Sequence, residues 1–141
     1  MNNTIKDNLK IIEKNIESLQ DSVFEKIIIN ASKIIIDSLK KNKKILFCGN
    51  GGSAGDSQHL SAELLGQYLK KRQPLAAVDL TSNTSLLTSV GNDISFDQVF
   101  SRQISAIGLK GDILFAITTS GKSKNIINAI KTAKHKGLKV I

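Results

Sequence analysis

A glycine-rich run, Cys48-Gly49-Asn50-Gly51-Gly52-Ser53, follows a strongly apolar segment of the chain. Glycine lets backbone N–H groups turn toward a ligand, and the N-terminus of a following helix favours an anion. In open α/β sheets, ligands bind beyond the C-terminal ends of the strands, which is where this run falls. The run does not complete the G-x-G-x-x-G pattern, which argues against a dinucleotide site. We therefore expect a ligand at this run, and a tight turn without a ligand is the alternative.

A second polar loop, Thr118-Thr119-Ser120-Gly121-Lys122-Ser123, stands between an apolar segment and a helical pattern. Its hydroxyl groups, its lysine and the start of a helix suit a phosphate group. A helix cap without a ligand is one alternative. A nucleotide-binding P-loop, G-x-x-x-x-G-K-[ST], is another, with Ala116 at the position of the first glycine. Because Ala116 is expected to lie inside a strand, the loop favours a sugar phosphate.

Three side chains with acid, base or metal-binding chemistry follow the glycine run. Asp56, His59 and Glu63 are spaced by three and four residues, so a helix would place them on one face. A histidine and a carboxylate at this spacing can share a divalent metal ion or act as an acid–base pair. A solvated polar face is the alternative.

Asn92 and Asp93 follow Gly91 in what the sequence predicts to be a turn. Their side chains can bind sugar hydroxyl groups, but asparagine and aspartate also favour turns for local reasons. Cys48 is expected to be an inert residue of the core, and His135 to be solvated.

Apolar periodicity predicts the elements that position these residues. Apolar residues spaced by three and four indicate two helices over 5–19 and 23–39. Strands are expected at 45–48, 75–80, 113–117 and 138–141, with helices near 53–69, 96–107 and 124–136 between them. Strands that alternate with helices indicate a parallel α/β sheet. The last apolar segment is expected to be a central strand and the chain ends inside it, so we expect a domain truncated at its C-terminus.

Length and composition restrict the class of protein. With 141 residues the chain has the size of one domain. The net charge is +8, but aromatic residues are only 4% and no stacking ladder accompanies the lysines, which argues against nucleic acid as the partner. No apolar run approaches the ~20 residues of a membrane span, and a single cysteine agrees with a reducing compartment. We expect a cytoplasmic protein that binds an anionic small molecule.

Taken together, these motifs resemble those of the phosphoheptose isomerases, enzymes built on the sugar isomerase (SIS) domain. The matching stretches occur in the order of that family: the glycine run, His59 with Ala62-Glu63-Leu64, Val90-Gly91-Asn92-Asp93, Phe100-Ser101-Arg102-Gln103 and Thr119-Ser120-Gly121-Lys122-Ser123. The resemblance implies an SIS-type, three-layer α/β fold, with a parallel sheet flanked by helices. It also implies one SIS domain over 1–141, with an N-terminal helical hairpin at 1–43 and an α/β core at 44–141.

The resemblance also implies a function and a set of site residues. Sedoheptulose 7-phosphate would be converted to D-glycero-D-manno-heptose 7-phosphate through an enediol, in heptose biosynthesis for surface glycoconjugates such as lipopolysaccharide. Glu63 would be the acid–base catalyst, and His59 and Glu63 would bind zinc. The sugar phosphate would contact Asn50, Gly51, Gly52, Ser53, Glu63, Asn92, Asp93, Thr118, Thr119, Ser120 and Ser123. The family forms homotetramers with sites between subunits, so a homo-oligomer is expected.

The sequence departs from the family pattern at some positions. Gln67 stands where many members have an arginine, and Lys124 is a variation beside the phosphate loop. The family's two further zinc ligands and its second acid–base histidine would lie beyond Ile141, and His135 falls in the wrong element to replace them. The alternative function is a non-catalytic SIS module that binds a sugar phosphate, or a protein partner as in the DnaA initiator-associating protein.

Overall fold

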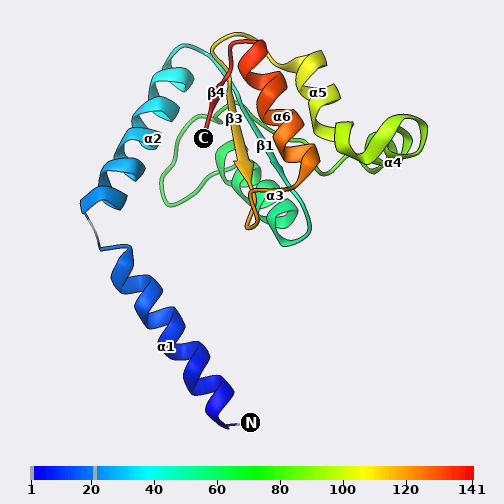
Figure 1. Ribbon diagram of the computed structural model, residues 1–141. Coiled ribbons are helices and arrows are strands. Elements are labelled where there is room, and N and C mark those ends of the chain that lie inside the picture. Colours follow the sequence, from blue (N-terminus) through cyan, green and yellow to red (C-terminus); the bar gives the residue numbers. More distant parts are fainter. Residues whose placement is uncertain (1, 21) are drawn as a thin grey trace. The chain divides into compact units, whose positions relative to one another are not determined.

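The computed structural model of the chain describes residues 2–20 and 22–141. Its contacts divide the chain into two compact units, Met1–Ile34 and Ile35–Ile141. The division falls inside a helix, α2, which spans Ser22–Lys40 (Figure 1). No helix in the described ranges has the length and apolar character needed to cross a membrane.

The first unit contains α1, Asn2–Ser18, and the first part of α2. Both predicted helices are confirmed. The apolar stripe of α1 faces solvent, because Ile5, Leu9, Ile12 and Ile16 are 63%, 58%, 53% and 55% exposed. Packing of the two helices as a hairpin stays a prediction.

The second unit is built on a parallel sheet, as the sequence predicts. Its described strands are β1 (Ile45–Gly49), β2 (Ala77–Asp79), β3 (Ile113–Ile117) and β4 (Lys139–Val140). They lie in the order β2-β1-β3-β4, and each neighbouring pair is parallel. The last strand therefore lies at the edge of the described sheet, where the sequence analysis expected a central strand.

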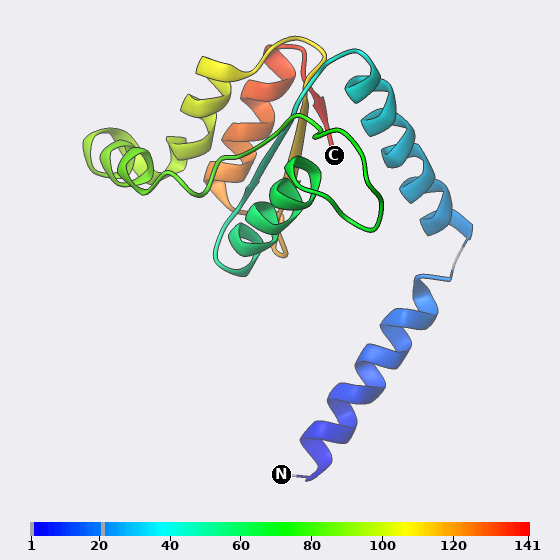
Figure 2. The same ribbon diagram turned by 180° about the vertical axis from the view of Figure 1, so that it is seen from behind.

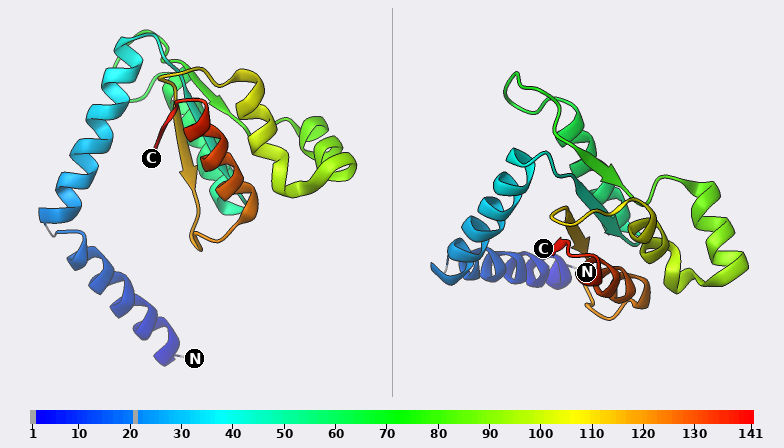
Figure 3. Two further views of the ribbon diagram at one scale, coloured as in Figure 1. Left: turned by 45° about the horizontal axis from the view of Figure 1, so that its top comes forward. Right: turned by 90° about the horizontal axis from the view of Figure 1, so that it is seen from above.

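Helices cover the two faces of this sheet. The helices are α3 (Gly52–Leu65), α4 (Thr84–Val90), α5 (Val99–Ile107) and α6 (Lys124–His135). In Figure 3, α3 lies on one side of the sheet while α5 and α6 lie side by side on the other. This is the three-layer arrangement that the α/β prediction requires, and it confirms the fold class.

The strands alternate their side chains between these two layers. Leu46, Cys48 and Leu114 point into the main core, where they pack with residues of α5 and α6 such as Ile104 and Ile126. Both faces of β1 are buried, which explains the continuous apolar run at the start of the α/β region. The core thus buries β1 and the first residues of β3, and the C-terminal ends of both strands carry the candidate site.

The helix expected to reach residue 69 ends at Leu65. The amide of Gly66 bonds to the carbonyl of Ala62 at 2.7 Å, and the chain then leaves in a long loop that runs to β2 (Figure 2). Leu75, expected in the second strand, instead donates its amide to the carbonyl of Leu64 at 3.0 Å. The loop returns to the end of α3, which shortens both the helix and β2.

The turn expected at Gly91-Asn92-Asp93 is also wrong. Residues Thr84–Val90 form α4, and the helix continues into a π-helical turn over Gly91–Ser95. Asn83 caps α4 by accepting from the amide of Leu86, and the Thr88 hydroxyl bonds to the carbonyl of Thr84 at 2.7 Å. Because these polar side chains bond within the helix, a segment rich in serine and threonine is helical here.

Candidate functional site

The two predicted ligand loops lie next to each other at one edge of the sheet. Gly49, the last residue of β1, pairs in register with Ile117, the last residue of β3. The next strand along the chain, β2, pairs with one side of β1, whereas β3 pairs with the other side of β1. Ligands of open α/β sheets bind at such a reversal of strand order, because the loops that leave the two strands diverge there.

These loops enclose a small pocket of about 60 Å³. Its lining residues are Asn50, Ser53, Ile117, Thr118, Thr119, Ser120 and Ser123. All but Ile117 belong to the predicted site, and Gly51 and Gly52 connect two of the lining residues. The side chain of Lys122 does not line the pocket and is exposed.

Two glycines explain how the first loop reaches this shape. A Cβ atom on Gly49 would lie 2.3 Å from the carbonyl oxygen of Ser53, so no larger residue fits there. Gly51 has a φ of 55° and begins α3 without a side-chain cap. Its positive φ is costly for other residues and turns the chain into α3. The amides of Ser53 and Ala54 bond to the carbonyls of Asn50 and Gly51, each at 3.0 Å, so this end of α3 attracts an anion mainly through its partial positive charge.

The second loop keeps its hydroxyl groups available. The oxygens of Thr118 and Ser120 accept bonds from the amides of Gly121 and Lys122, each at 3.2 Å, so their protons can be donated to a ligand. Ser123 precedes α6 but does not cap it with its side chain. The loop thus offers hydroxyl donors and a helix N-terminus to one small space.

The structure contradicts the P-loop alternative for the second loop. Ala116 lies inside β3 and pairs with Cys48 of β1, so the chain is extended where a P-loop would begin its turn.

Cys48 is an inert residue of the core, as the sequence predicts. Burial, with the nearby Asp79 carboxylate as a second cause, raises the pKa of its thiol to about 12.

Asn125, in the first turn of α6, is a residue that the sequence analysis missed. It is only 3% exposed and exchanges two side-chain hydrogen bonds with Asn50, at 2.9 and 2.8 Å. These bonds connect the two ligand loops across the sheet edge. Only its position two residues after Ser123 could have drawn attention to it.

The predicted acid–base residues meet on α3. Nε2 of His59 lies 3.5 Å from Oε1 of Glu63, and their side chains are 74% and 35% exposed. Asp56 and His59 line a hollow of about 350 Å³ that shares Ile117 with the pocket between the loops. Glu63 lines a further hollow of about 200 Å³. This hollow shares Leu60 and Phe115 with the one beside His59, so the two hollows are neighbours on the surface of the α/β unit.

Arg72 holds the end of the helix that carries these residues. Its guanidinium donates to the carbonyls of Glu63 at 2.6 Å and Leu64 at 2.9 Å, which are orphan acceptors at the C-terminus of α3. The long loop after α3 therefore bonds directly to the backbone of Glu63. The sequence shows only an arginine in a basic segment, so this contact could not be foreseen.

Asn92 and Asp93 lie outside the pocket between the loops. Both are exposed on the π-helical turn, where Nδ2 of Asn92 donates to Oδ1 of Asp93 at 2.7 Å. Their contact with a substrate stays a prediction.

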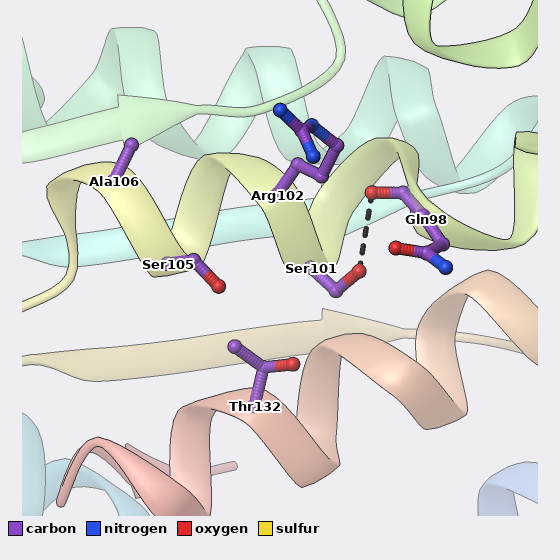
Figure 4. Close-up of a pocket in the computed structure, with 6 residues that line it drawn as sticks. All are labelled: Gln98, Ser101, Arg102, Ser105, Ala106 and Thr132. Carbon is purple, nitrogen blue, oxygen red and sulfur yellow. Dashed lines mark hydrogen bonds between the residues drawn. The ribbon is translucent and has the colours of Figure 1, made fainter. Parts of the chain in front are cut away.

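Another hollow, of about 460 Å³, lies between α5 and α6 (Figure 4). It is lined by Gln98, Ser101, Arg102, Ser105, Ala106 and Thr132. This hollow shares no residue with the pocket between the loops. Within it, the Ser101 hydroxyl donates to the carbonyl of Gln98 at 3.1 Å. It contains no predicted site residue.

Comparison with known proteins agrees with this fold. Residues 9–141 match the SIS domain family. The chain is 55% identical to a phosphoheptose isomerase of Rhodospirillum rubrum over 114 residues, which cover 81% of this chain and 61% of that protein. It is 46% identical over 140 residues to a phosphoheptose isomerase of a Nitratiruptor species, covering 94% of this chain and 74% of that protein.

A solved structure, phosphoheptose isomerase GmhA of Neisseria gonorrhoeae, superposes with a TM-score of 0.88 at 39% identity, over 99% of this chain and 72% of that one. The chain spans about three fifths of the length of the Rhodospirillum relative (61%). This chain therefore belongs to the SIS domain family and, within it, to the phosphoheptose isomerases.

Proposed function

We propose that this chain binds sedoheptulose 7-phosphate and isomerises it to D-glycero-D-manno-heptose 7-phosphate. The observation that carries the proposal is the pocket between the loops together with the neighbouring hollows that His59 and Glu63 line. The names of its relatives, phosphoheptose isomerases, support the same reaction.

The pocket suits the phosphate end of the substrate. Hydroxyl donors of Thr119, Ser120 and Ser123 surround it, and no carboxylate lines it. The helices α3 and α6 both begin there and supply the partial positive charge of their N-termini. Gly51 and Gly52 allow the backbone to approach the ligand closely.

The sugar would then extend from the pocket toward His59 and Glu63 on α3, so that the phosphate and the reacting carbons would occupy neighbouring but separate regions.

Glu63 would move the proton that the reaction transfers. Its carboxylate would remove a proton from C1 of the ketose while the C2 carbonyl oxygen gains one, which gives the enediol. Return of a proton to C2 and loss of one from the C1 hydroxyl leave the aldose, so the isomerisation is balanced without an oxidant. The partial exposure of Glu63, 35%, leaves it accessible to the substrate.

We also propose that His59 and Glu63 hold a zinc ion. Ligands at ~2.1 Å from a tetrahedral zinc are about 3.4 Å apart, which agrees with the 3.5 Å between Nε2 of His59 and Oε1 of Glu63. Bound there, zinc would stabilise negative charge on the substrate oxygens. The described residues contain no group of three metal-binding side chains, so further ligands would have to come from elsewhere.

Turnover of sedoheptulose 7-phosphate in D₂O tests the proposal. We expect the aldose product to carry deuterium at C2, because an enediol exchanges its proton with solvent. Glu63→Gln should lower kcat by about 10²–10⁴-fold, the usual contribution of a general base. Asp97→Asn, on the surface near α6, is the matched control and should retain full activity. Equal activity of wild type and Glu63→Gln would refute the catalytic role.

One observation favours a second candidate, a binding module without catalysis. Among the described residues, His59 and Glu63 have no third metal-binding neighbour. Such a module would bind the sugar phosphate, or a protein partner of the kind bound by the DnaA initiator-associating protein, without turnover. Saturable binding of sedoheptulose 7-phosphate with no product would support it over the isomerase.

A further inference from the structure

The pair formed by Asn50 and Asn125 fixes the relation between the two ligand loops. The residues are separated by 75 positions in the sequence, and their side chains exchange hydrogen bonds of 2.9 and 2.8 Å. Asn50 belongs to the glycine loop after β1, and Asn125 belongs to the first turn of α6.

The orientation of both amide groups follows from a backbone contact. The amide of Ile126 lies 2.9 Å from Oδ1 of Asn125. A backbone N–H can only donate, so the atom it meets must be the oxygen of that side chain. The same oxygen accepts from Nδ2 of Asn50, and Nδ2 of Asn125 then donates to Oδ1 of Asn50. The backbone of α6 therefore sets how Asn50 presents its amide group.

This arrangement leaves Asn50 with capacity for a ligand. Each side-chain amide has two N–H donors and two acceptor lone pairs, and the contact with Asn125 uses one of each. Asn50 is half-buried and lines the pocket, so its remaining donor and acceptor can reach a ligand. Asn125 is 3% exposed and does not line the pocket. Asn125 thus acts on the pocket through Asn50.

We propose that Asn125 is a positioning residue of the sugar-phosphate site, which orients the Asn50 amide group and holds the glycine loop against the Thr118–Ser123 loop. The inference rests on the proposed function, since it concerns the affinity of that same site. It assigns no direct contact between Asn125 and the ligand.

A double-mutant cycle tests this role. Binding of sedoheptulose 7-phosphate to the full chain is measured by calorimetry for wild type, Asn50→Ala, Asn125→Ala and the double variant. Loss of a buried hydrogen-bonded pair predicts a Kd about tenfold higher for Asn125→Ala. In the Asn50→Ala background the same change should alter Kd less than twofold. Asn128→Ala, one turn along α6, removes a bond to the carbonyl of Asp97 and should leave Kd within twofold of wild type.

The outcomes separate the two proposals. An unchanged Kd for Asn125→Ala, or the same rise in both backgrounds, would overturn the positioning role while leaving the proposed function intact. No binding by folded wild type would overturn both.

NMR of the Asn50 side-chain amide gives a readout that does not depend on binding. Its resonances should move toward solvent-exposed values in Asn125→Ala and remain in place in Asn128→Ala. Asn125→Asp, which keeps the acceptor for Ile126, is the second variant if Asn125→Ala fails to fold. It places a carboxylate oxygen against Oδ1 of Asn50 and should shift the same resonances. Resonances that stay in place in a folded variant would contradict the inference.

Discussion

At the scale of single residues, the site depends on close approaches that few side chains permit. Gly49 ends β1 where the backbone of Ser53 folds back toward it. Gly51 adopts a positive φ, and Asn50, between the two glycines, meets Asn125. The glycine run therefore combines a steric requirement with a conformational one, and neither depends on a ligand.

Replacing Gly49 by alanine should destabilise the protein. The added Cβ would lie 2.3 Å from the Ser53 carbonyl oxygen, so the start of α3 must shift. We expect the free energy of unfolding, measured by urea denaturation, to fall by about 1–3 kcal/mol. Gly55→Ala is the control, because nothing lies within 4 Å of its added Cβ. In a helix that change should be neutral or stabilise by up to about 1 kcal/mol. Equal losses in both variants would contradict the steric explanation.

At the scale of elements, Asp112 fixes β1 and β3 relative to each other. Its carboxylate accepts from the amide of Lys44 at 3.1 Å and the amide of Leu109 at 2.8 Å, and it pairs with the Lys44 ammonium group. The side chain of Asp112 is 2% exposed. Because it anchors the N-terminal ends of both strands, it sets the register that brings the ligand loops together at their other ends.

This anchor predicts a pH dependence of stability. Burial by itself raises the pKa of Asp112, but hydrogen bonds from Lys44 and Leu109 outweigh it and hold the pKa below the ordinary value of 3.8. A carboxyl with a lowered folded pKa stabilises the fold above its unfolded pKa, and this contribution is lost as the pH falls through the folded pKa. Urea denaturation at pH 7 and at lower pH values should show a loss of stability below about pH 4.

Asp112→Asn should reduce stability at pH 7 and flatten this acid dependence. The matched control is Asp97→Asn, because Asp97 is 43% exposed and lies 3.9 Å from the Lys124 ammonium group. An exposed pair contributes little, so the control should retain the wild-type profile. An unchanged acid limb in Asp112→Asn would show that other groups cause it.

At the scale of the whole molecule, the exposed stripe of α1 predicts self-association. Ile5, Leu9, Ile12 and Ile16 are spaced by four, three and four residues, which is the spacing of a coiled-coil seam. All are more than half exposed. A second copy of the chain, as expected of a homo-oligomer, would bury this stripe.

Light scattering after size exclusion should therefore give a mass above that of one 15.3 kDa chain. Replacing Ile12 and Ile16 together by aspartate should shift the protein toward the mass of one chain, because charges in a seam oppose its burial. Lys14→Ala, on the same helix, should leave the mass unchanged. A wild-type mass of one chain at micromolar concentrations would contradict the prediction.

The sequence alone predicted the parallel α/β class, the glycine and hydroxyl loops, and the pairing of His59 with Glu63. These features depend on local rules: apolar periodicity, the freedom of glycine, and the spacing of residues on one helical face. The same rules failed over Gly91–Ser95, which continues α4 as a π-helical turn, and at the end of α3, where a returning loop bonds to backbone carbonyls that local reasoning left open.

Only the tertiary structure decided which loops meet. The sequence places both ligand loops after strands, but it does not show that β1 and β3 are neighbours in the sheet. That pairing brings the loops after these two strands together at the pocket. It also gives no sign that Asn125 bonds to Asn50, or that Asp112 and Arg72 anchor the strands and α3. These contacts join residues far apart in the chain, so they depend on strand order and helix packing, which no local pattern encodes.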